Sequence, residues 1–545
     1  MFKKLLILSA LGGLLLGIIT IIVSLPNYVF AQSVDTAWVR RYNGPADSTD
    51  LASAIAVDGS GNVYVTGSSY GSGTYYDYAT IKYYPNGDTS WVRRYNGFGN
   101  GWDEACAIEV DNSGNVYVLG RSDQDSSDII NFARVTIKYL PNGDTSWVRY
   151  YGPENYCFCE DGLAVDNFGN VYTTGASGTL KYDSTGNQLW VGSWGGEVIT
   201  LDASDNIYVT GGGLDYVTIK YYSNGDTAWV RKYNGLGNSL DYPTAIVVDN
   251  SSNVYVTGWS VGSGTDDDYA TIKYYSNGDT AWVRRYNNAP VDSTDRAWAL
   301  AVDNSGNVYV TGWSIGSGTL QDYATLKYSP NGDTAWVRRY NGSDDYYDWA
   351  SDIRVDYSGN VYVTGYSIGY GYDYATIKYY PNGDTAWVIR YNGPVSANDI
   401  ARALTVDDSG YVYVTGESVS GAIGARHYDF ATIKYKQDIT PSVKDETSSR
   451  VKPSKFALSQ NYPNPFNQTT KIEFALAHSG FVSLTIYDLL GRKVRTLVSE
   501  NLSSGCKSVL WDGKDDSGKE VASGIYFYRL KIGDFSEAKR LVLLK

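Results

Sequence analysis

The sequence contains few of the residues that most often build metal centres and histidine-based catalytic sites. It has 2 His, 4 Cys and 1 Met among 545 residues. His427 and His478 lie in regions with different sequence patterns, so a histidine-based triad or metal site within either region would have one histidine to draw on. We therefore expect no cofactor and no metal, and the sequence singles out no catalytic residue.

The sequence also lacks an excess of basic residues. It carries 45 Lys and Arg against 59 Asp and Glu, for a formal net charge of −14. Recognition of nucleic-acid phosphates needs a concentrated basic surface, and here the Lys and Arg residues are spread evenly along the chain. We expect no nucleic-acid partner.

Long apolar runs are missing from the chain after its first residues. The one such run, Leu5 to Leu25, follows the basic Lys3 and Lys4 and precedes a Val29-Phe30-Ala31 site. A charged start, an apolar middle and small residues at the cut predict a secretory signal peptide over residues 1–31, cleaved after Ala31. An uncleaved membrane anchor is the alternative. We expect an exported protein that meets a membrane only through this segment or through a surface anchor.

Export would place the few cysteines in an oxidising compartment, where they can pair. Four cysteines allow three full pairings. Cys106 and the close pair Cys157 and Cys159 each precede the first strand of neighbouring repeats, which makes a disulfide between adjacent units geometrically plausible. Cys-x-Cys without a nearby His or second pair is poor spacing for zinc.

The sequence is rich in Tyr (51), Trp (15) and Gly (58), which recur in one repeated unit. The best copy reads LAVDNSGNVYVTG, a variable loop, then DYATLKYSPNGDTAWVRRY, and similar units fill residues 35–435. Each unit holds four segments with strand character. In the best copy these segments are Leu300–Val302, Val308–Thr311, Tyr323–Tyr328 and Ala335–Tyr340. Four antiparallel strands per unit are typical of a β-propeller blade, so we predict an all-β fold.

Two markers give the same number of units. A Val-Asp or Leu-Asp pair ends the first strand of eight units, and a Trp strand also occurs eight times. The chain begins with a Trp strand at Trp38 that has no first strand before it, and the last unit ends at Tyr435 without a Trp strand. We predict an eight-bladed propeller in which the N-terminal strand completes the last blade, because closure removes a sheet edge. A seven-bladed ring with one unclosed unit is the alternative.

The repeat AVDGSGNVYVTG at Ala56 to Gly67 and its copies resemble the bacterial β-propeller repeat family known as SBBP. The resemblance covers essentially residues 35–435. It implies a secreted or surface propeller, and it carries no catalytic residues. The family name refers to seven blades, and this sequence departs from it by showing eight copies.

The pattern stops after the propeller. Residues 436–454 are polar, charged and punctuated by proline, which predicts a linker. Residues 455–545 alternate apolar and polar residues between Gly- and Asp-rich turns, which predicts a small β-sandwich. Its expected strands are Lys471–Leu476, Val482–Tyr487, Lys493–Val498, Ser508–Trp511, Ile525–Lys531 and Lys539–Leu544.

The tail carries ordered motifs: NYPNPFN from Asn461, IYD from Ile486, WDG from Trp511 and ASGIY from Ala522. Together they resemble the C-terminal sorting domain of the type IX secretion system. The tail is also similar to the immunoglobulin-like domain of flagellar hook-capping proteins, which implies an immunoglobulin-like β-sandwich. The resemblance to the sorting domain implies that the tail engages the secretion machinery and that the protein ends outside the cell or on the outer-membrane surface. An accessory sandwich without a sorting role is the alternative.

Loop lengths predict which face of the ring binds a ligand. The connections between strands one and two and between strands three and four are short and repetitive, so they share one face, and the variable connections must share the other. The variable segments carry aromatic residues suited to a glycan or a protein ligand. The candidate residues of the ligand face are Trp102, Trp259, Trp313, Trp349, Tyr346 and Tyr366. The alternative for Trp259 and Trp313 is packing between blades.

These features predict a non-catalytic binding or scaffold protein. One alternative is a polysaccharide hydrolase or lyase, which would need two carboxylates from different blades to converge at the axis. Another is a purely structural adhesion component. The residue before the Val-Asp pair is small or aliphatic in most units but is Glu109 in one and Arg354 in another. These two residues either line the central channel or reflect exposed variation.

Overall fold

The computed structural model describes residues 34–124, 132–154, 162–288, 293–369, 371–421, 427–437, 456–458, 461, 464, 466, 469–502, 505–533 and 535–544. The chain divides into two compact units, residues 1–439 and 440–545. The predicted signal peptide with Ala31, most of the predicted linker, and Cys157 and Cys159 lie outside the described residues. Among the residues that are described, no helix is long and apolar enough to cross a membrane.

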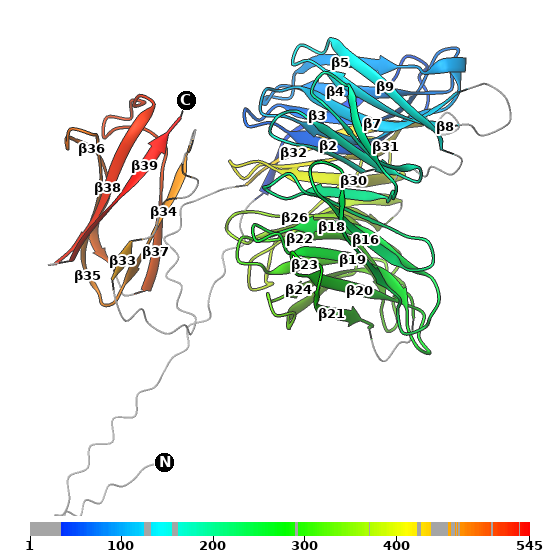
Figure 1. Ribbon diagram of the computed structural model, residues 1–545. Coiled ribbons are helices and arrows are strands. Elements are labelled where there is room, and N and C mark those ends of the chain that lie inside the picture. The colour runs from blue at the N-terminus through cyan, green and yellow to red at the C-terminus, as the bar shows by residue number, and fades with distance from the viewer. Residues whose placement is uncertain are drawn as a thin grey trace, which may run out of the picture. The chain divides into compact units, whose positions relative to one another are not determined.

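The first unit is built from four-stranded antiparallel sheets, and eight such sheets are described. Within a sheet the strands lie in the order of the chain, except in the sheet that closes the ring. A single short 3-10 helix, η1 (Phe98–Asn100), is described in a connection. Repeated four-stranded sheets confirm the predicted all-β propeller architecture (Figure 1).

The first strands contact one another around the ring, and the last of them contacts the first. They are β2 (Asp50–Val57), β6 (Asp103–Val110), β10 (Gly162–Val165), β14 (Val198–Leu201), β18 (Asp241–Val248), β22 (Asp295–Val302), β26 (Asp348–Val355) and β30 (Asp399–Val406). The second strands are β3 (Val63–Tyr70), β7 (Val116–Asp123), β11 (Val171–Gly175), β15 (Ile207–Gly211), β19 (Val254–Val261), β23 (Val308–Ile315), β27 (Val361–Ile368) and β31 (Val412–Ser420).

The third strands are β4 (Tyr76–Tyr83), β8 (Phe132–Tyr139), β12 (Gly178–Tyr182), β16 (Tyr216–Tyr221), β20 (Asp267–Tyr274), β24 (Gln321–Tyr328), β28 (Tyr372–Tyr379) and β32 (His427–Gln437). The fourth strands are β5 (Thr89–Tyr95), β9 (Thr145–Glu154), β13 (Gln188–Gly192), β17 (Thr227–Tyr233), β21 (Thr280–Tyr286), β25 (Thr334–Tyr340), β29 (Thr385–Tyr391) and, in the closing sheet, β1 (Val34–Tyr42). Each of these fourth strands carries the Trp of its repeat on the outer edge of its sheet.

The four strands predicted for the best copy are all present, and each is longer than predicted, the first two by several residues. Strand β22 begins at Asp295 instead of Leu300. A bulge between Ala297 and Ala299 adds one residue to β22, and pairing then continues to Asp295, which faces Ser314. The added segment differs from copy to copy, so the repeat pattern did not reveal it.

The repeated Asp fixes the turn between the first two strands of each blade. In the best copy, Oδ1 of Asp303 accepts hydrogen bonds from the backbone N–H groups of Ser305 and Asn307, both at 2.9 Å. Its Oδ2 accepts a 2.9 Å hydrogen bond from the hydroxyl of the buried Tyr309. Gly306 adopts a φ of 77°, which the turn requires and glycine permits. One carboxylate therefore joins the turn to the core.

Except at the closing blade, each blade is fastened to the next through the turn between its neighbour's third and fourth strands. Lys273 Nζ and Trp282 Nε1 both donate to the carbonyl of Pro330 in the following blade, at 3.2 Å each. Arg284 Nε donates to the carbonyl of Gly332 in the same turn at 2.7 Å. The repeated Lys, Trp and first Arg thus have a structural role.

The N-terminal strand closes the ring, as predicted. Strand β1 pairs with β32, and Tyr42 faces Phe430 while Thr36 faces Tyr435. Trp38 Nε1 and Lys434 Nζ both donate to the carbonyl of Pro85 in the first blade, at 3.1 Å each. In Figure 1 the yellow strands β30 to β32 accordingly lie beside the blue strands of the chain start.

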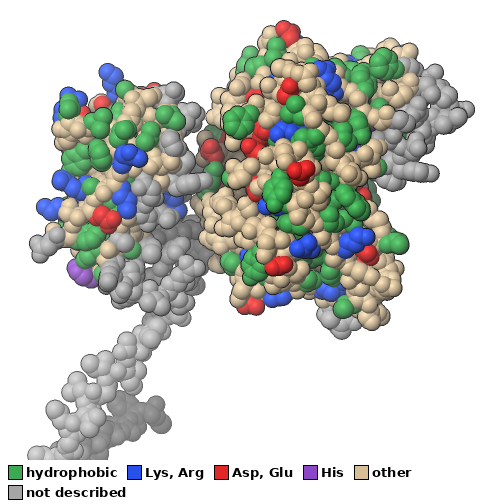
Figure 2. Space-filling view, in the orientation of Figure 1, with side chains coloured by type: hydrophobic (Ala, Val, Ile, Leu, Met, Phe, Trp, Pro, Cys, Tyr) green, Lys and Arg blue, Asp and Glu red, His purple; other side chains and the backbone are tan. Residues whose placement is uncertain are grey.

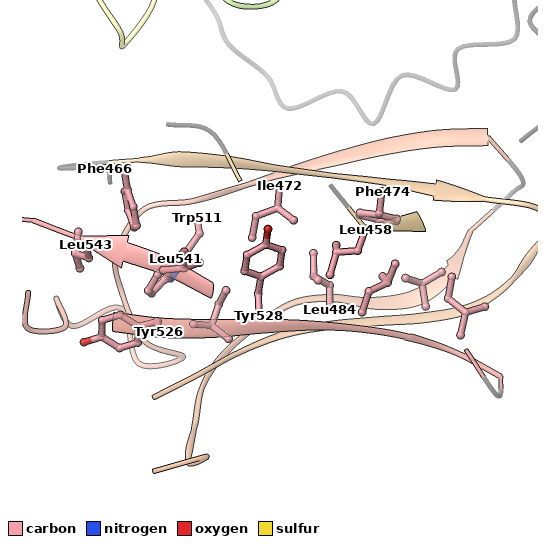
Figure 3. Packing of buried hydrophobic residues seen from close by; sticks show 14 of the residues in the cluster. Leu458, Phe466, Ile472, Phe474, Leu484, Trp511, Tyr526, Tyr528, Leu541 and Leu543 are labelled. Atoms are coloured by element: carbon pink, nitrogen blue, oxygen red, sulfur yellow. The ribbon is translucent and has the colours of Figure 1, made fainter. Parts of the chain in front are cut away.

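The second unit is a β-sandwich. Its sheets are β33 (Ala457–Leu458), β34 (Thr470–Leu476) and β37 (Gly505–Trp511), and β36 (Lys493–Leu502), β35 (Gly480–Tyr487), β38 (Gly524–Ile532) and β39 (Phe535–Leu543). All six predicted strands are present. Figure 3 shows side chains of the two sheets meeting in one apolar core, with Trp511 and Tyr528 fully buried at its centre.

Candidate functional site

The two faces of the propeller are distinct, as loop lengths predicted. At one end of the blades the links between blades meet the connections between strands two and three: the N–H of Tyr70 donates to the carbonyl of Thr49 at 3.1 Å, and that of Tyr75 to the carbonyl of Asn100 at 3.4 Å. We call this end the loop face. At the other end, the turn face, short turns meet one another, and a Cβ added at Gly61 of one turn would lie 3.6 Å from Pro85 of another.

Charges of both signs are interspersed over the visible surface of the first unit (Figure 2). Lys and Arg gather into no continuous patch on that side. The expectation of no nucleic-acid partner stays a prediction.

Two of the six candidate ligand-face residues are exposed. The Trp102 side chain is 44% accessible, and its ring lies 4.9 Å from that of Tyr76, which leaves part of the indole open to solvent. Tyr346 is 55% accessible in the link before β26, next to Tyr347. Both residues lie in links of the loop face, where the residue type at a given position varies from blade to blade.

The other four candidates are strand residues, and the prediction that they lie in loops is wrong. Trp259 is on β19, Trp313 on β23, Trp349 on β26 and Tyr366 on β27. Trp259 and Trp313 are only 9% and 7% accessible. The strands extend further toward the loop face than the repeat motif suggested, so residues placed after the strand ends are in fact paired within the sheets. The alternative that they pack between blades therefore describes these two Trp residues.

These side chains form one stack that crosses three blades. Tyr242 stacks on Trp259 with ring centroids 5.6 Å apart and planes inclined by 19°. Arg296 Cζ lies 4.5 Å from the Trp259 ring and 5.8 Å from the Trp313 ring. Trp313 in turn stacks on Trp349 at 5.7 Å. The guanidinium between two indoles makes cation–π contacts with both, so the stack fastens the blades and offers little free ring face to a ligand.

The second Arg of the Trp strand builds a polar cluster beneath the loop face. In one blade, Arg339 Nη2 lies 2.7 Å from Asp322 Oδ2 and donates to the carbonyl of Ser314 at 2.7 Å. Thr319 from the connection above donates to the same carboxylate oxygen at 3.0 Å. Five pairs of this kind are described: Arg41–Asp429, Arg94–Asp77, Arg285–Asp268, Arg339–Asp322 and Arg390–Asp373.

A further buried Asp begins the first strand of most blades. Burial raises the pKa of Asp50, Asp103 and Asp295 to about 6 each. Each carboxylate still accepts a hydrogen bond from a backbone N–H of the preceding link, as Asp50 does from Gly44 at 2.6 Å. These acids hold the links against the blades. Their titration makes the stability of the ring sensitive to pH.

Glu109 and Arg354 interact electrostatically although they lie far apart in the sequence and in different blades. Both lie on first strands, the innermost of the ring, and both are solvent-accessible. Protein surrounds Glu109 at the axis, and this burial raises its pKa to about 7 against the opposing effect of Arg354. No hydrogen bond or ion pair between the two residues is described, so channel lining stays a prediction.

Asp352, the other acid at this level, already has partners. Its carboxylate accepts hydrogen bonds from the backbone N–H of Leu404 at 2.9 Å and from Arg354 Nη1 at 2.6 Å. Asp352 is thus buried between its own first strand and that of the next blade, whereas Glu109 only experiences the charge of Arg354. No interaction between the two carboxylates is described, so the paired-acid arrangement of a glycosidase has no support among the described residues.

Within the described part of the chain, no group of three His, Cys, Asp or Glu residues could hold a metal ion. Cys106 is disulfide-bonded. The disulfide predicted between Cys106 and the Cys157 and Cys159 pair remains a prediction, because the latter two lie outside the described residues.

The motif residues of the tail serve its fold. The backbone N–H of Asn461 donates to the Tyr528 hydroxyl at 2.8 Å, and Asn464 Oδ1 accepts from the N–H of Val542 at 2.8 Å. Phe466 packs on Trp511 with ring centroids 5.5 Å apart. The NYPNPFN motif therefore pins the start of the unit onto the sandwich. Through Phe466 and Trp511, this motif contacts one of the later motifs.

Several solved structures are similar to the chain at low identity. PorZ, a surface component of the type-IX secretion system of Porphyromonas gingivalis, is 12% identical over 92% of this chain and 76% of that chain, with a TM-score of 0.38. A protein of unknown function from Bacteroides caccae is 11% identical over 52% and 98%, with a TM-score of 0.32. A gluconolactonase from Xanthomonas campestris is 16% identical over 50% and 85%, with a TM-score of 0.30. At these scores the likenesses do not discriminate between a surface component and an enzyme.

Comparison with proteins of curated function finds none that matches the chain. Family models match both units. The model described as a beta-propeller repeat matches residues 37–73, 228–264, 292–318 and 335–373. The model described as an FlgD Ig-like domain matches residues 460–533. The chain therefore contains beta-propeller repeats followed by an FlgD Ig-like domain.

Proposed function

We propose that this chain is an exported, non-catalytic binding or scaffold protein that acts outside the cell or on its outer surface. Residues 1–31 act as the signal peptide, the ring binds a glycan or a protein, and the C-terminal unit engages the type IX secretion machinery. The observation that carries the binding role is the exposure of aromatic residues in the links of the loop face, where residue types vary between blades, with Trp102 and Tyr346 as the leading pair.

Exposure of a residue whose type varies between blades supports a role in binding because the blade architecture does not require it. Turn-face residues such as Tyr84, Tyr222 and Tyr275 are also exposed, but the same residue type recurs at their position and belongs to the common turn. The position of Trp102 instead holds Thr49 or Leu240 in other blades, and the exposed Tyr347 in the link of Tyr346. Large aromatic side chains held by a rigid scaffold give contact area at low entropic cost.

Binding of glycans and surface proteins to the chain without residues 1–31 tests this role. Trp102→Ala and Tyr346→Ala should weaken binding about tenfold or more, the usual effect of removing a central aromatic contact. Tyr84→Ala and Tyr357→Ala are matched controls, because these tyrosines are 48% and 63% accessible on the turn face. Loss of binding in the controls alone would show that the ligand meets the other face.

The sorting role rests on the ordered motifs of the tail and on the match of residues 460–533 to an FlgD Ig-like domain. A chain that lacks residues 461–545 should fold its ring yet fail to reach the cell surface of its native host. Protease resistance of the retained protein would show that the ring is folded. Normal surface delivery of the truncated chain would leave the tail as an accessory sandwich.

A catalytic role for the ring has less support. A polysaccharide hydrolase or lyase on this scaffold would use the acids at the axis, but Glu109 experiences the charge of Arg354 and Asp352 is hydrogen-bonded to it. Glu109→Gln separates the two functions. For a binding protein, the substitution should leave ligand affinity within about twofold of that of the unmodified protein. If the unmodified protein released reducing sugar ends from a polysaccharide and Glu109→Gln did not, the protein would be an enzyme instead.

A further inference from the structure

A polar recess opens on the loop face of the blade formed by β26 to β29. Its volume is about 600 Å³, and it lies between the link after Tyr340 and the Arg390–Asp373 pair. Sites for small ligands commonly enclose roughly 300–1,000 Å³. The walls are polar: Asn341, Asn392 and Ser396 contribute amide and hydroxyl groups.

The recess exists because one connection is short. In the preceding blade, residues 316–320 join strands two and three, and Thr319 covers the buried acid by donating to Asp322 at 3.0 Å. In this blade only residues 369–371 make the connection, and it contains no threonine. The proposed site does not include Tyr370, which lies outside the described residues.

The surroundings of the glycine that begins this connection give a second comparison between the blades. A Cβ added at Gly316 would overlap Thr319, and one at Gly71 or Gly262 would overlap Thr74 or Thr265 in the same way. A Cβ added at the equivalent Gly369 would instead lie 3.6 Å from Arg390 Nη2 and 3.9 Å from Asp373 Oδ2, which are ordinary contact distances. The threonine that contacts this glycine in three blades thus has no counterpart among the described residues of this connection, and Gly369 lies directly above the ion pair.

Accessibility agrees with this geometry. The Asp373 side chain is 15% accessible, against 5% to 8% for the acids of the other four pairs. Arg390 Nη2 and Asp373 Oδ2 are 2.9 Å apart, and Arg390 also donates to Ser367. Asn341 Nδ2 donates to Asp345, while Asn341 Oδ1 is buried without a hydrogen-bond partner among the described residues. The accessible polar groups that the recess offers are therefore those of the Arg390–Asp373 pair.

We propose that this recess binds a neutral sugar ring through adjacent hydroxyl groups. An Arg–Asp pair presents donors and an acceptor side by side, which matches hydroxyls that both donate and accept. The acids Asp344 and Asp373 face one cation, Arg390, so an anionic ligand would be repelled. The inference deepens the proposed binding function and rests on it, since it names the ligand class of one site on the loop face.

Titration of the chain without residues 1–31 with methyl glycosides of glucose, galactose, mannose and xylose, followed by saturation-transfer NMR and calorimetry, tests the site. Gly369→Leu should fill the recess and weaken binding at least tenfold, with an unchanged thermal unfolding midpoint. Arg390→Gln should weaken it tenfold to about a hundredfold, the usual effect of losing a charged hydrogen-bond partner. Arg339→Gln removes the same kind of pair where Thr319 covers it, and should leave affinity within twofold.

Each outcome decides between defined alternatives. Neutral glycosides that bind equally well to the unmodified protein and to Gly369→Leu overturn the recess but leave glycan binding by the ring intact. Glucuronate or glucosamine binding in place of neutral glycosides overturns the ligand class. If none of these sugars binds, the inference fails, and the proposed binding function then depends on the protein ligands tested with Trp102→Ala and Tyr346→Ala. Gly369→Leu keeps the test decisive should Arg390→Gln fail to fold.

Discussion

The blade that closes the ring differs from an ordinary blade in the group that accepts hydrogen bonds from the preceding blade. In an ordinary blade the turn between strands three and four presents backbone carbonyls, and that of Pro330 accepts hydrogen bonds from Lys273 and Trp282. In the closing blade β32 and β1 come from opposite ends of the chain, so no turn joins them. A side chain takes its place: Gln437 Oε1 accepts from Lys378 at 2.6 Å and from Trp387 at 3.3 Å.

The comparison shows that the closing interface depends on a few side chains. The ordinary interfaces use a backbone acceptor that almost any sequence supplies, while the closing one depends on the identity of one residue. Gln437 also donates from Nε2 to the carbonyl of Gly410 at 2.6 Å and to the Tyr362 hydroxyl at 3.2 Å. Gln437 and Lys378 are 5% and 4% accessible. Replacing either side chain by an apolar one would therefore leave the polar group of the other buried without this hydrogen bond.

Removing the closing strand should give the largest effect. Deletion of residues 35–43 exposes the edge of β32 and removes the buried Trp38. Loss of one buried Trp alone costs about 3–5 kcal/mol, so the thermal unfolding midpoint should fall sharply. The control is the chain that begins at Gln32. An unchanged unfolding curve would show that the ring does not depend on closure.

Replacing Gln437 by Met should give the next largest effect. The substitution keeps the volume but removes the acceptor of Lys378 Nζ, which should destabilise the ring by about 2–4 kcal/mol. Lys378→Met combined with Gln437→Met should recover part of this loss, because the pair is then replaced by apolar groups. Additive losses in urea unfolding, without coupling between the two positions, would contradict the proposed role of Gln437.

Much of this fold could be predicted from the sequence. The order of strands within a repeat, the pairing of Trp38 with the last unit and the division of loops between two faces all follow from a pattern that recurs. Gln437 could not be found this way, because it lies where the pattern ends and its role is defined by a turn that is absent. The repeats reveal the contacts that the blades have in common, and the closing contact of Gln437 is not one of them.

The candidate site was predicted only in part, for a related reason. Trp102 and Tyr346 are exposed on the predicted face, but Trp259 and Trp313 are held in a stack around Arg296. Sequence shows that a residue varies between repeats, but it does not show whether a neighbouring blade covers it. The recess above Arg390 had a visible signal in the short connection at residues 369–371, which a comparison of loop lengths blade by blade would have found.

The acids that begin the first strands should behave alike in ordinary and closing blades. Burial raises the pKa of Asp50 to about 6 from a usual 3.8, and it also raises that of Asp399 in the closing blade. Each acid holds its proton more tightly in the folded chain, so stability should fall as pH rises from about 4 to 6. Asp50→Asn and Asp399→Asn should each flatten this dependence, by up to about 3 kcal/mol for Asp50.

Asp202→Asn is the opposite control, measured by urea unfolding between pH 4 and pH 7.5. Burial alone would raise the Asp202 pKa, but hydrogen bonds from Asn206, Tyr208 and Ser204 outweigh it and lower the pKa. Its contribution is therefore present at neutral pH and lost on acidification. If Asp50→Asn and Asp202→Asn changed the pH dependence in the same direction, burial would not be the cause of the Asp50 shift.

The smallest expected effect concerns the first Arg of the Trp strand, whose place Ile389 takes before the closing blade. Arg338 Nε donates to the carbonyl of Gly383 in the next blade's turn at 2.6 Å. Ile389 faces the blade without that turn and packs against its apolar cluster instead. Arg338→Ile should cost about 1 kcal/mol through the lost hydrogen bond, and Ile389→Arg should bring no gain, because no turn carbonyl is there to accept. A stabilising Ile389→Arg, measured by urea unfolding, would mean that the closing blade accepts its neighbour as an ordinary blade does.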